Sequence, residues 1–145
     1  MKIAVRYHSR GGNTKTLAQA IADAVGVKAE MIGVPFDEPV ELLFVGGGVY
    51  GGAIKGDIDR SLRSYLESLE PSVVKSVAAF STAGIMDGAK RIASAVKEKG
   101  IHVHSETLPM KVGPRNHRTF VKEGFLTLTA KELVAVDAFV KKVLT

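Results

Sequence analysis

The residues of this chain best suited to chemistry form a short loop that could bind phosphate. The loop reads Ser9-Arg10-Gly11-Gly12-Asn13-Thr14; it follows an apolar run, Ile3–Val5, and precedes a helical pattern. A loop that leads into a helix leaves backbone N–H groups unpaired, and the helix dipole favours an anion there. The glycines allow the backbone to approach phosphate oxygens closely, and Ser9, Asn13 and Thr14 can add side-chain hydrogen bonds.

The loop matches neither of the two commonest nucleotide-binding motifs. A P-loop has lysine and then Ser or Thr directly after its last glycine, whereas Asn13 and Thr14 follow Gly12. The dinucleotide-binding fingerprint needs three glycines at fixed spacing, and only two are present here. By itself, therefore, the loop indicates either a phosphate site or an ordinary tight turn between a strand and a helix.

Strand and helix patterns alternate along the chain. Strands are predicted at 2–7, 27–34, 42–45, 73–80 and 101–108, and helices at 14–25, 57–69, 87–99 and from 129 onward. Asp57 is expected to cap the second helix, Thr129 and Glu132 have the spacing of a capping box, and Leu133 is expected on the buried face of the last helix. The alternation predicts an α/β fold in which helices cover both faces of a five-stranded parallel sheet. We expect a single domain over residues 1–145, with some packed structure of its own within 109–128.

Two further loops of small residues follow predicted strands. They are Gly46–Gly52, after the third strand, and Ser81–Gly84, after the fourth. In a parallel sheet both loops lie at the same edge as Ser9–Thr14, and α/β proteins bind ligands outside the carboxyl ends of their strands. Three such loops at one edge predict a ligand site more strongly than one loop does.

With these three loops in this order and spacing, the chain resembles the short-chain flavodoxin family over nearly all of its length. The first motif of the family is matched by Tyr7, Ser9, Gly12, Thr14 and Ala18. The second and third loops look like the two loops that lie against the flavin ring in that family. The resemblance implies a three-layer flavodoxin-like fold with strand order 2-1-3-4-5, and FMN bound without a covalent bond.

The resemblance also implies roles for individual residues. The FMN phosphate would be held by Ser9, Arg10, Gly11, Gly12, Asn13 and Thr14. The isoalloxazine ring would lie between two sets of loop residues, which are Gly48, Val49, Tyr50 and Gly51 on one side and Ser81, Thr82, Ala83 and Gly84 on the other. Tyr50 is the candidate for stacking on the ring. Gly51 corresponds to the position at which, in this family, a peptide bond flips when flavin N5 gains a proton. Glycine suits that position because it can adopt both backbone conformations.

Some positions depart from the pattern of the family. Arg6 stands where an apolar residue is expected, Gly11 replaces a hydroxyl residue, and Ile85 replaces an aromatic residue over the outer face of the ring. His8 and Arg10 either add positive charge near the phosphate or point into solvent. The chain is basic, whereas flavodoxins are typically acidic, so we expect a less negative potential for addition of the second electron.

Composition narrows the class of protein. The chain has no cysteine, which excludes disulfides, thiolate metal sites and thiol chemistry. No apolar run approaches the roughly 20 residues of a membrane-spanning helix, and with no signal-peptide pattern we expect a cytoplasmic location.

The net charge is +5. Residues 88–122 hold eight basic and two acidic residues, a surplus that fits an acidic partner; we favour a solvated face over a nucleic-acid interface.

The leading functional hypothesis is an FMN-dependent electron carrier between redox partner proteins, with the chemistry supplied by the cofactor. No catalytic set of side chains is evident. His102 and His104 alternate along one strand, but two ligands are too few for a metal site, and we expect both to face solvent. The alternatives are an FMN-dependent oxidoreductase that acts on a quinone or porphyrinogen, and a flavodoxin-like domain that has lost its flavin and serves as an interaction module.

Overall fold

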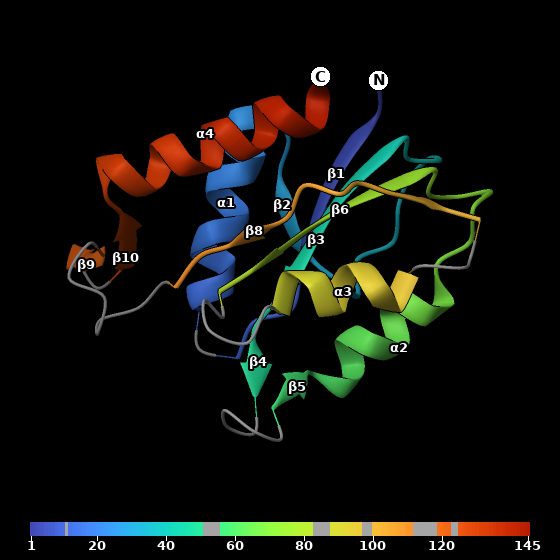
Figure 1. Cartoon of the computed structure of the whole chain (residues 1–145), viewed down its shortest axis with the longest axis horizontal. Coiled ribbons are helices and arrows are strands. Elements are labelled where there is room, and N and C mark those ends of the chain that lie inside the picture. The colour runs from blue at the N-terminus through green and yellow to red at the C-terminus, as the bar shows by residue number, and fades with distance from the viewer. Residues whose placement is uncertain (11, 51–55, 83–87, 97–99, 112–118, 123–124) are drawn as a thin grey trace.

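A parallel sheet lies between two pairs of helices in the computed structural model of the chain (Figure 1). The structure describes residues 1–10, 12–50, 56–82, 88–96, 100–111, 119–122 and 125–145, and of 119–122 and 125–127 only the backbone. α1 and α4 cover one face of the sheet, and α2 and α3 cover the other (Figure 1). The three layers predicted from the sequence are therefore confirmed.

The central sheet is parallel throughout. Its strands are β1 (Ile3–Tyr7), β2 (Ala29–Met31), β3 (Leu42–Gly47), β6 (Ser76–Ser81), β7 (His102–Val103) and β8 (Leu108–Pro109). Neighbouring strands follow the order β2-β1-β3-β6-β7, and β8 also pairs with β6. With β8 left aside this is the predicted order 2-1-3-4-5, but among the described residues the sheet has six strands where five were predicted.

The fifth strand is divided into two pieces, contrary to the single strand predicted at 101–108. β7 pairs with Ser76 and Val77 near the start of β6, and β8 pairs with Phe80 and Ser81 at its end. The residues between the two pieces, 104–107, are all polar. A polar segment at a sheet edge gains little from burial, so the ladder is interrupted there.

Two separate cores hold the layers together. One lies between the sheet and α1 and α4, and it includes Val5, Phe44, Phe80 and Phe139. The other lies between the sheet and α2 and α3, and it includes Val45 and residues of both helices. β3 is buried along its whole length, as its continuous apolar sequence predicts for a central parallel strand.

The helices differ from the predictions mainly at their ends. They are α1 (Asn13–Val25), α2 (Arg60–Ser68), α3 (Gly88–Val96) and α4 (Ala130–Leu144). The expected cap of α2 was wrong: Asp57 lies in a short strand, and Asp59 caps the helix by accepting a hydrogen bond from the Ser61 amide. The predicted capping box of Thr129 and Glu132 is present at the start of α4. Leu133 is 44% exposed and so is not a core residue.

Two small antiparallel ladders complete the described fold. β4 (Val49–Tyr50) pairs with β5 (Asp57–Ile58), and β9 (Thr119–Lys122) pairs with β10 (Phe125–Leu128). The second ladder confirms that 109–128 contains structure of its own. Among the described residues, no helix is long and apolar enough to cross a membrane.

Glycine at position 46 is required by close packing inside the sheet. A Cβ atom added there would collide with both the ring and the carbonyl oxygen of Phe80 on the neighbouring strand. The first glycine of the Gly46-Gly47-Gly48 run therefore belongs to the buried strand, and the loop begins after Gly47.

A candidate ligand site at the carboxyl edge of the sheet

Three loops meet at the carboxyl ends of β1, β3 and β6, which are neighbours in the sheet. The Thr14 hydroxyl lies 3.0 Å from that of Thr82, which joins the first loop to the third. A Cβ atom on Gly48 would lie 3.3 Å from the Tyr50 hydroxyl oxygen and 3.5 Å from Thr82 Oγ1, so the second loop reaches the same place. The predicted convergence of the loops is confirmed for these residues. Of the predicted site residues, Gly11, Gly51, Ala83 and Gly84 lie outside the described part of the chain.

The first loop is shaped to leave an open helix end. Gly12 has a φ of 90°, a left-handed conformation that favours glycine, and its amide donates a 2.9 Å hydrogen bond to Ser9 Oγ. The Thr16 hydroxyl donates to the Gly12 carbonyl oxygen at 3.1 Å. Within the part of the chain that the structure describes, no side chain caps α1, and its first turn, which begins at Asn13, has no acidic residue. The amides of this turn therefore form a positive helix end, which suits an anion.

The third loop is anchored by buried contacts. Ser81 is fully buried, whereas Thr82 is partly exposed. A Cβ atom on Gly88, at the start of α3, would collide with Ser81 Oγ and would lie 2.8 Å from Val49. The missing side chain at Gly88 thus lets α3 pack directly against the second and third loops. Ser81 supports the loop, and Thr82 is the residue that faces the junction.

Asp59 is a residue of this edge that the sequence analysis did not single out. The Nε and Nη2 atoms of Arg10 donate to Asp59 Oδ2 at 3.2 and 2.6 Å, and His8 Nε2 lies 3.5 Å from Asp59 Oδ1. The hydrogen bond from Arg10 lowers the pKa of the Asp59 carboxyl, with help from the Ser61 amide and against the effect of burial. An Asp directly before an amphipathic pattern could have been recognised as a cap, but its pairing with Arg10 depends on the folded loops.

Arg10 also lies against the aromatic candidate of the second loop. Its guanidinium carbon is 3.7 Å from the centre of the Tyr50 ring, a cation–π arrangement. The His8 ring stands edge-on to Tyr50, with 6.4 Å between ring centres. Of the two alternatives for His8 and Arg10, the one in which both point freely into solvent is therefore wrong. The His8 side chain is only 16% exposed, and Arg10, although 56% exposed, is held by Asp59 and Tyr50.

A second carboxylate fixes the base of the second loop. Asp57 is paired with Arg63 of α2 at 2.8 Å and with Arg91 of α3 at 3.4 Å, and Arg91 also donates to the Gly56 carbonyl oxygen at 2.5 Å. Burial raises the pKa of Asp57, but the Ile58 amide and the arginines outweigh burial and leave the pKa below its usual value.

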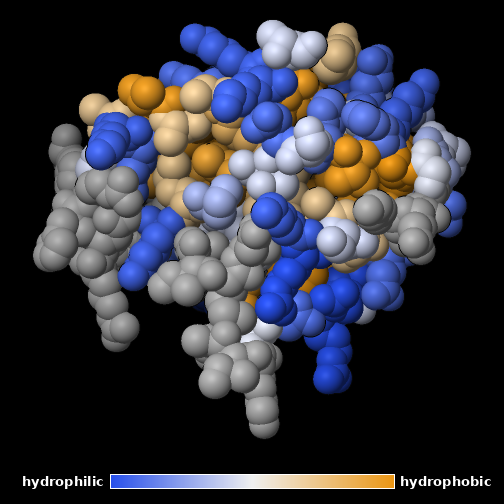
Figure 2. All heavy atoms as spheres, viewed as in Figure 1, coloured by the Kyte–Doolittle hydropathy of each residue, from blue (hydrophilic) through white to orange (hydrophobic). Residues whose placement is uncertain are grey.

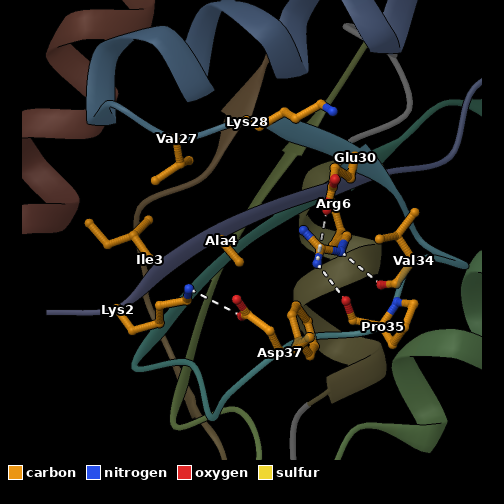
Figure 3. Close-up of a pocket in the computed structure, with 11 residues that line it drawn as sticks. Lys2, Ile3, Ala4, Arg6, Val27, Lys28, Glu30, Val34, Pro35 and Asp37 are labelled. Carbon is orange, nitrogen blue, oxygen red and sulfur yellow. Dashed lines mark hydrogen bonds and ion pairs between the residues drawn. The ribbon is translucent and has the colours of Figure 1, made fainter.

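Arg6, the unexpected charge in the first strand, has a structural role away from this edge. The side chain is almost fully buried, and it donates to the carbonyl oxygens of Val34 and Pro35 at 3.1 and 3.3 Å. It also lies 3.4 Å from Glu30 and 4.6 Å from the centre of the Phe36 ring. Arg6 is one of the residues that line a hollow of about 360 Å³. Figure 3 shows its guanidinium beside Val34, Pro35 and Glu30. The guanidinium thus ties the segment after β2 to the sheet.

The two histidines of the fifth strand form a close pair. Their ring centres lie 4.8 Å apart, His102 is exposed, and His104 is only partly exposed, so the expectation that both face solvent holds for the first alone. Burial, and secondarily His102, lowers the pKa of His104. No group of three or more residues that could hold a metal ion occurs in the described part of the chain.

Comparison with solved structures identifies the fold of the chain. An archaeal flavodoxin superimposes with a TM-score of 0.69 at 21% identity, with full coverage of both chains. The chain has the flavodoxin fold. Oxidised Flavodoxin 2 from Bacillus cereus gives a TM-score of 0.68 at 15% identity, covering 97% of this chain and 96% of that one. Two-electron reduced Megasphaera elsdenii flavodoxin gives 0.55 at 18% identity, covering 96% and 98%.

Comparison of structures finds this likeness, whereas comparison of the sequence with known families and curated proteins does not. No protein-family model matches the sequence, and no curated protein matches it. At identities of 15 to 21% the likeness defines the fold, while the roles of the loop residues depend on their own chemistry. The flavodoxin fold predicted from the resemblance of the three loops is thereby confirmed.

Proposed function

We propose that the protein binds FMN without a covalent bond at the carboxyl edge of its sheet and carries electrons between redox partner proteins. The observation that supports this best is the junction of the three loops at Thr14, Gly48, Tyr50 and Thr82. A flat, partly apolar ring with an anionic tail suits an edge that combines an open helix end with an aromatic residue and small residues.

The residues of the first loop fit the phosphate of FMN. Among the described residues no side chain caps the amino end of α1, and the hydrogen bond from the Gly12 amide to Ser9 Oγ fixes the loop that precedes it. Lys15, exposed in the first turn, adds positive charge. A phosphate dianion satisfies unpaired amides and is stabilised by the helix dipole. We propose that Asn13 and Gly11 complete this cradle.

The residues of the second and third loops fit the isoalloxazine ring. Gly48 allows close approach, Val49 and Tyr50 offer apolar and aromatic surface, and Thr82 offers a hydroxyl group. Arg10 covers one face of the Tyr50 ring, so the stacking that we propose uses the opposite face or displaces Arg10. For Gly51, Ala83 and Gly84 the proposed contacts are inferred from the sequence resemblance. Bound FMN supplies the electron-transfer chemistry, and these residues bind it and exclude water.

Titration with FMN and with riboflavin, which lacks the phosphate, tests this proposal. We expect FMN fluorescence to be quenched and flavin absorption to be retained through gel filtration. Two charge-assisted hydrogen bonds to phosphate, at about 1.5 kcal/mol or more each, predict FMN affinity at least ~100-fold above that of riboflavin. A protein that leaves FMN fluorescence unchanged would contradict the proposal and favour an interaction module without flavin.

A matched pair of serine variants tests the phosphate loop. Ser9→Ala removes the acceptor for the Gly12 amide, and we expect it to weaken FMN binding about tenfold, the equivalent of one such hydrogen bond. Ser68→Ala removes a hydroxyl at the far end of α2, where it bonds the Tyr65 carbonyl oxygen, and should leave FMN affinity unchanged. Equal losses in the two variants would show that Ser9 acts through overall stability.

The alternative function is an oxidoreductase for a quinone or porphyrinogen. Measuring turnover by the purified protein distinguishes it from the electron carrier. Purified FMN-loaded protein should not oxidise NADH or NADPH with a quinone acceptor unless a partner reductase is added. Rapid turnover by the protein alone would favour the oxidoreductase. We propose a cytoplasmic location for the carrier, and cell fractionation tests it.

A further inference from the structure

The first turns of the three helices that begin at the ligand edge carry basic residues where acidic residues are usual, although the cap that precedes α2 is an aspartate, Asp59. None of α1, α2 and α3 has an acidic residue in its first turn. Their first turns instead carry basic residues, which are Lys15 in α1, Arg60 and Arg63 in α2, and Lys90 and Arg91 in α3. Positive charge at a helix amino end is unfavourable for the helix by a few tenths of a kcal/mol to ~1 kcal/mol per residue.

α4 shows that this pattern is not a general property of a basic chain. It has Glu132 in its first turn and Lys141 and Lys142 in its last turn, as the helix dipole favours. The reversed pattern is therefore confined to the helices whose amino ends surround the candidate site.

We call these basic residues, together with Arg10 of the first loop, the basic rim: Arg10, Lys15, Arg60, Arg63, Lys90 and Arg91. Asp59 pairs with Arg10, and Asp57, two residues earlier, pairs with both Arg63 and Arg91. Among the described residues, the five rim residues other than Lys90 have a surplus of three positive charges over these two carboxylates. Figure 2 shows hydrophilic side chains gathered over β5, α2 and the start of α3.

We propose that the basic rim is the docking surface for an acidic protein, which exchanges electrons with the FMN that we place at this edge. This inference rests on the proposed function, because it takes FMN as the group that exchanges electrons with the partner. A surface of one sign around the ligand edge raises the rate of productive encounter with a partner of the opposite sign. The two aspartates hold three arginines in place while leaving them 38 to 56% exposed, so less side-chain entropy is lost on docking.

A protein suits this surface better than a nucleic acid does. Single-stranded nucleic acids bind through aromatic side chains on which bases stack, in addition to charge. Among the described residues at the rim, Tyr50 is the aromatic side chain that could serve, and Arg10 covers one of its faces. The rim thus offers charge without a row of stacking platforms.

Two double variants with the same change in net charge test the docking surface. Arg60→Glu with Lys90→Glu reverses two exposed rim charges, and Lys141→Glu with Lys142→Glu does the same at the far end of α4. Binding of a fluorescently labelled 20-residue poly-glutamate is measured by anisotropy, with and without FMN. We expect the rim variant to lose affinity at least tenfold, the α4 variant to lose less than twofold, and binding to weaken between 50 and 200 mM salt.

A kinetic measurement applies the same variants to electron transfer. A reduced acidic [2Fe–2S] ferredoxin, which has a strongly negative reduction potential, should pass its electron to the oxidised, FMN-loaded protein more slowly as salt is added, and the rim variant should lose about tenfold in rate at low salt. Equal losses in the two double variants would overturn the inference. A 20-nucleotide single-stranded DNA that binds more than tenfold tighter than poly-glutamate would instead identify the surface as a nucleic-acid site.

The outcomes separate this inference from the proposed function. If the protein does not bind FMN but poly-glutamate still distinguishes the two variants, the proposed function is wrong and the rim remains an acidic-partner surface. If FMN binds and neither variant affects poly-glutamate or ferredoxin, the docking inference is wrong and the FMN site stands.

Discussion

Asp59 performs two tasks that two substitutions can separate. Its Oδ1 atom caps α2 through a 2.7 Å hydrogen bond from the Ser61 amide, and its Oδ2 atom binds Arg10. Asp59→Asn keeps a good capping side chain and removes the charge, whereas Asp59→Ala removes both tasks.

The structure sets the expected size of each effect. Because Arg10 is 56% exposed, loss of its charge pairing with Asp59 should cost about 0.5 to 1 kcal/mol, within the range of a solvent-screened pair. Loss of the cap should cost a further ~1 kcal/mol. We therefore expect Asp59→Ala to lower the free energy of unfolding by about 1.5 to 2 kcal/mol, and Asp59→Asn by about half as much or less.

Urea denaturation at pH 7 measures these losses, with Asp137→Asn on an exposed face of α4 as the control that should change stability by less than ~0.5 kcal/mol. The pKa of Asp59 is lowered in the folded protein, so the stabilisation by its charge is complete above the ordinary value of 3.8 and is lost as the pH falls through the folded-state pKa. The wild-type protein should accordingly lose its advantage over Asp59→Asn in that acidic range. Equal destabilisation by Asn and Ala at pH 7 would refute the separation of the cap from the ion pair.

Three further predictions concern packing, capping and the buried arginine. Gly46→Ala should destabilise by at least ~1 to 3 kcal/mol in urea because its Cβ atom collides with a phenylalanine of the next strand, while Gly33→Ala, whose Cβ atom meets nothing within 4 Å, should be neutral. Thr129→Ala should cost ~1 kcal/mol by breaking the capping box, and Glu132→Gln, which can still close the box, should cost less than half of that; the reverse order would be inconsistent with the box. Arg6→Met should lower the unfolding free energy by ~1 to 3 kcal/mol without altering FMN affinity, since it leaves carbonyl oxygens without donors away from the ligand edge; a selective loss of FMN binding would contradict the structural role of this arginine.

The elements with strong patterns were predictable from the sequence. The continuous apolar run Leu42–Val45 became a strand buried on both sides, and the capping-box spacing at Thr129 marked the start of α4. These features are local, because propensity and periodicity within a few residues decide them. The sheet order, in contrast, came from the resemblance to flavodoxins.

The features that sequence analysis missed depend on contacts between distant segments. Arg10 and Asp59 are 49 residues apart, so no local pattern connects them. The burial of Arg6 follows from carbonyl oxygens 28 and 29 residues away that turn toward it. Leu133 has helical spacing with the core residues of α4, but the neighbouring layer does not cover its position. Such outcomes are decided by tertiary packing, which overrides local preference.

The position of Arg10 couples two halves of the proposed ligand site thermodynamically. Arg10 belongs to the first loop and contacts Tyr50 of the second. A ligand that displaces Arg10 at one loop therefore also changes its contact with the other. Inorganic phosphate and riboflavin, which together carry the two ends of FMN, should then bind interdependently. By linkage, the factor by which phosphate changes riboflavin affinity must equal the factor by which riboflavin changes phosphate affinity.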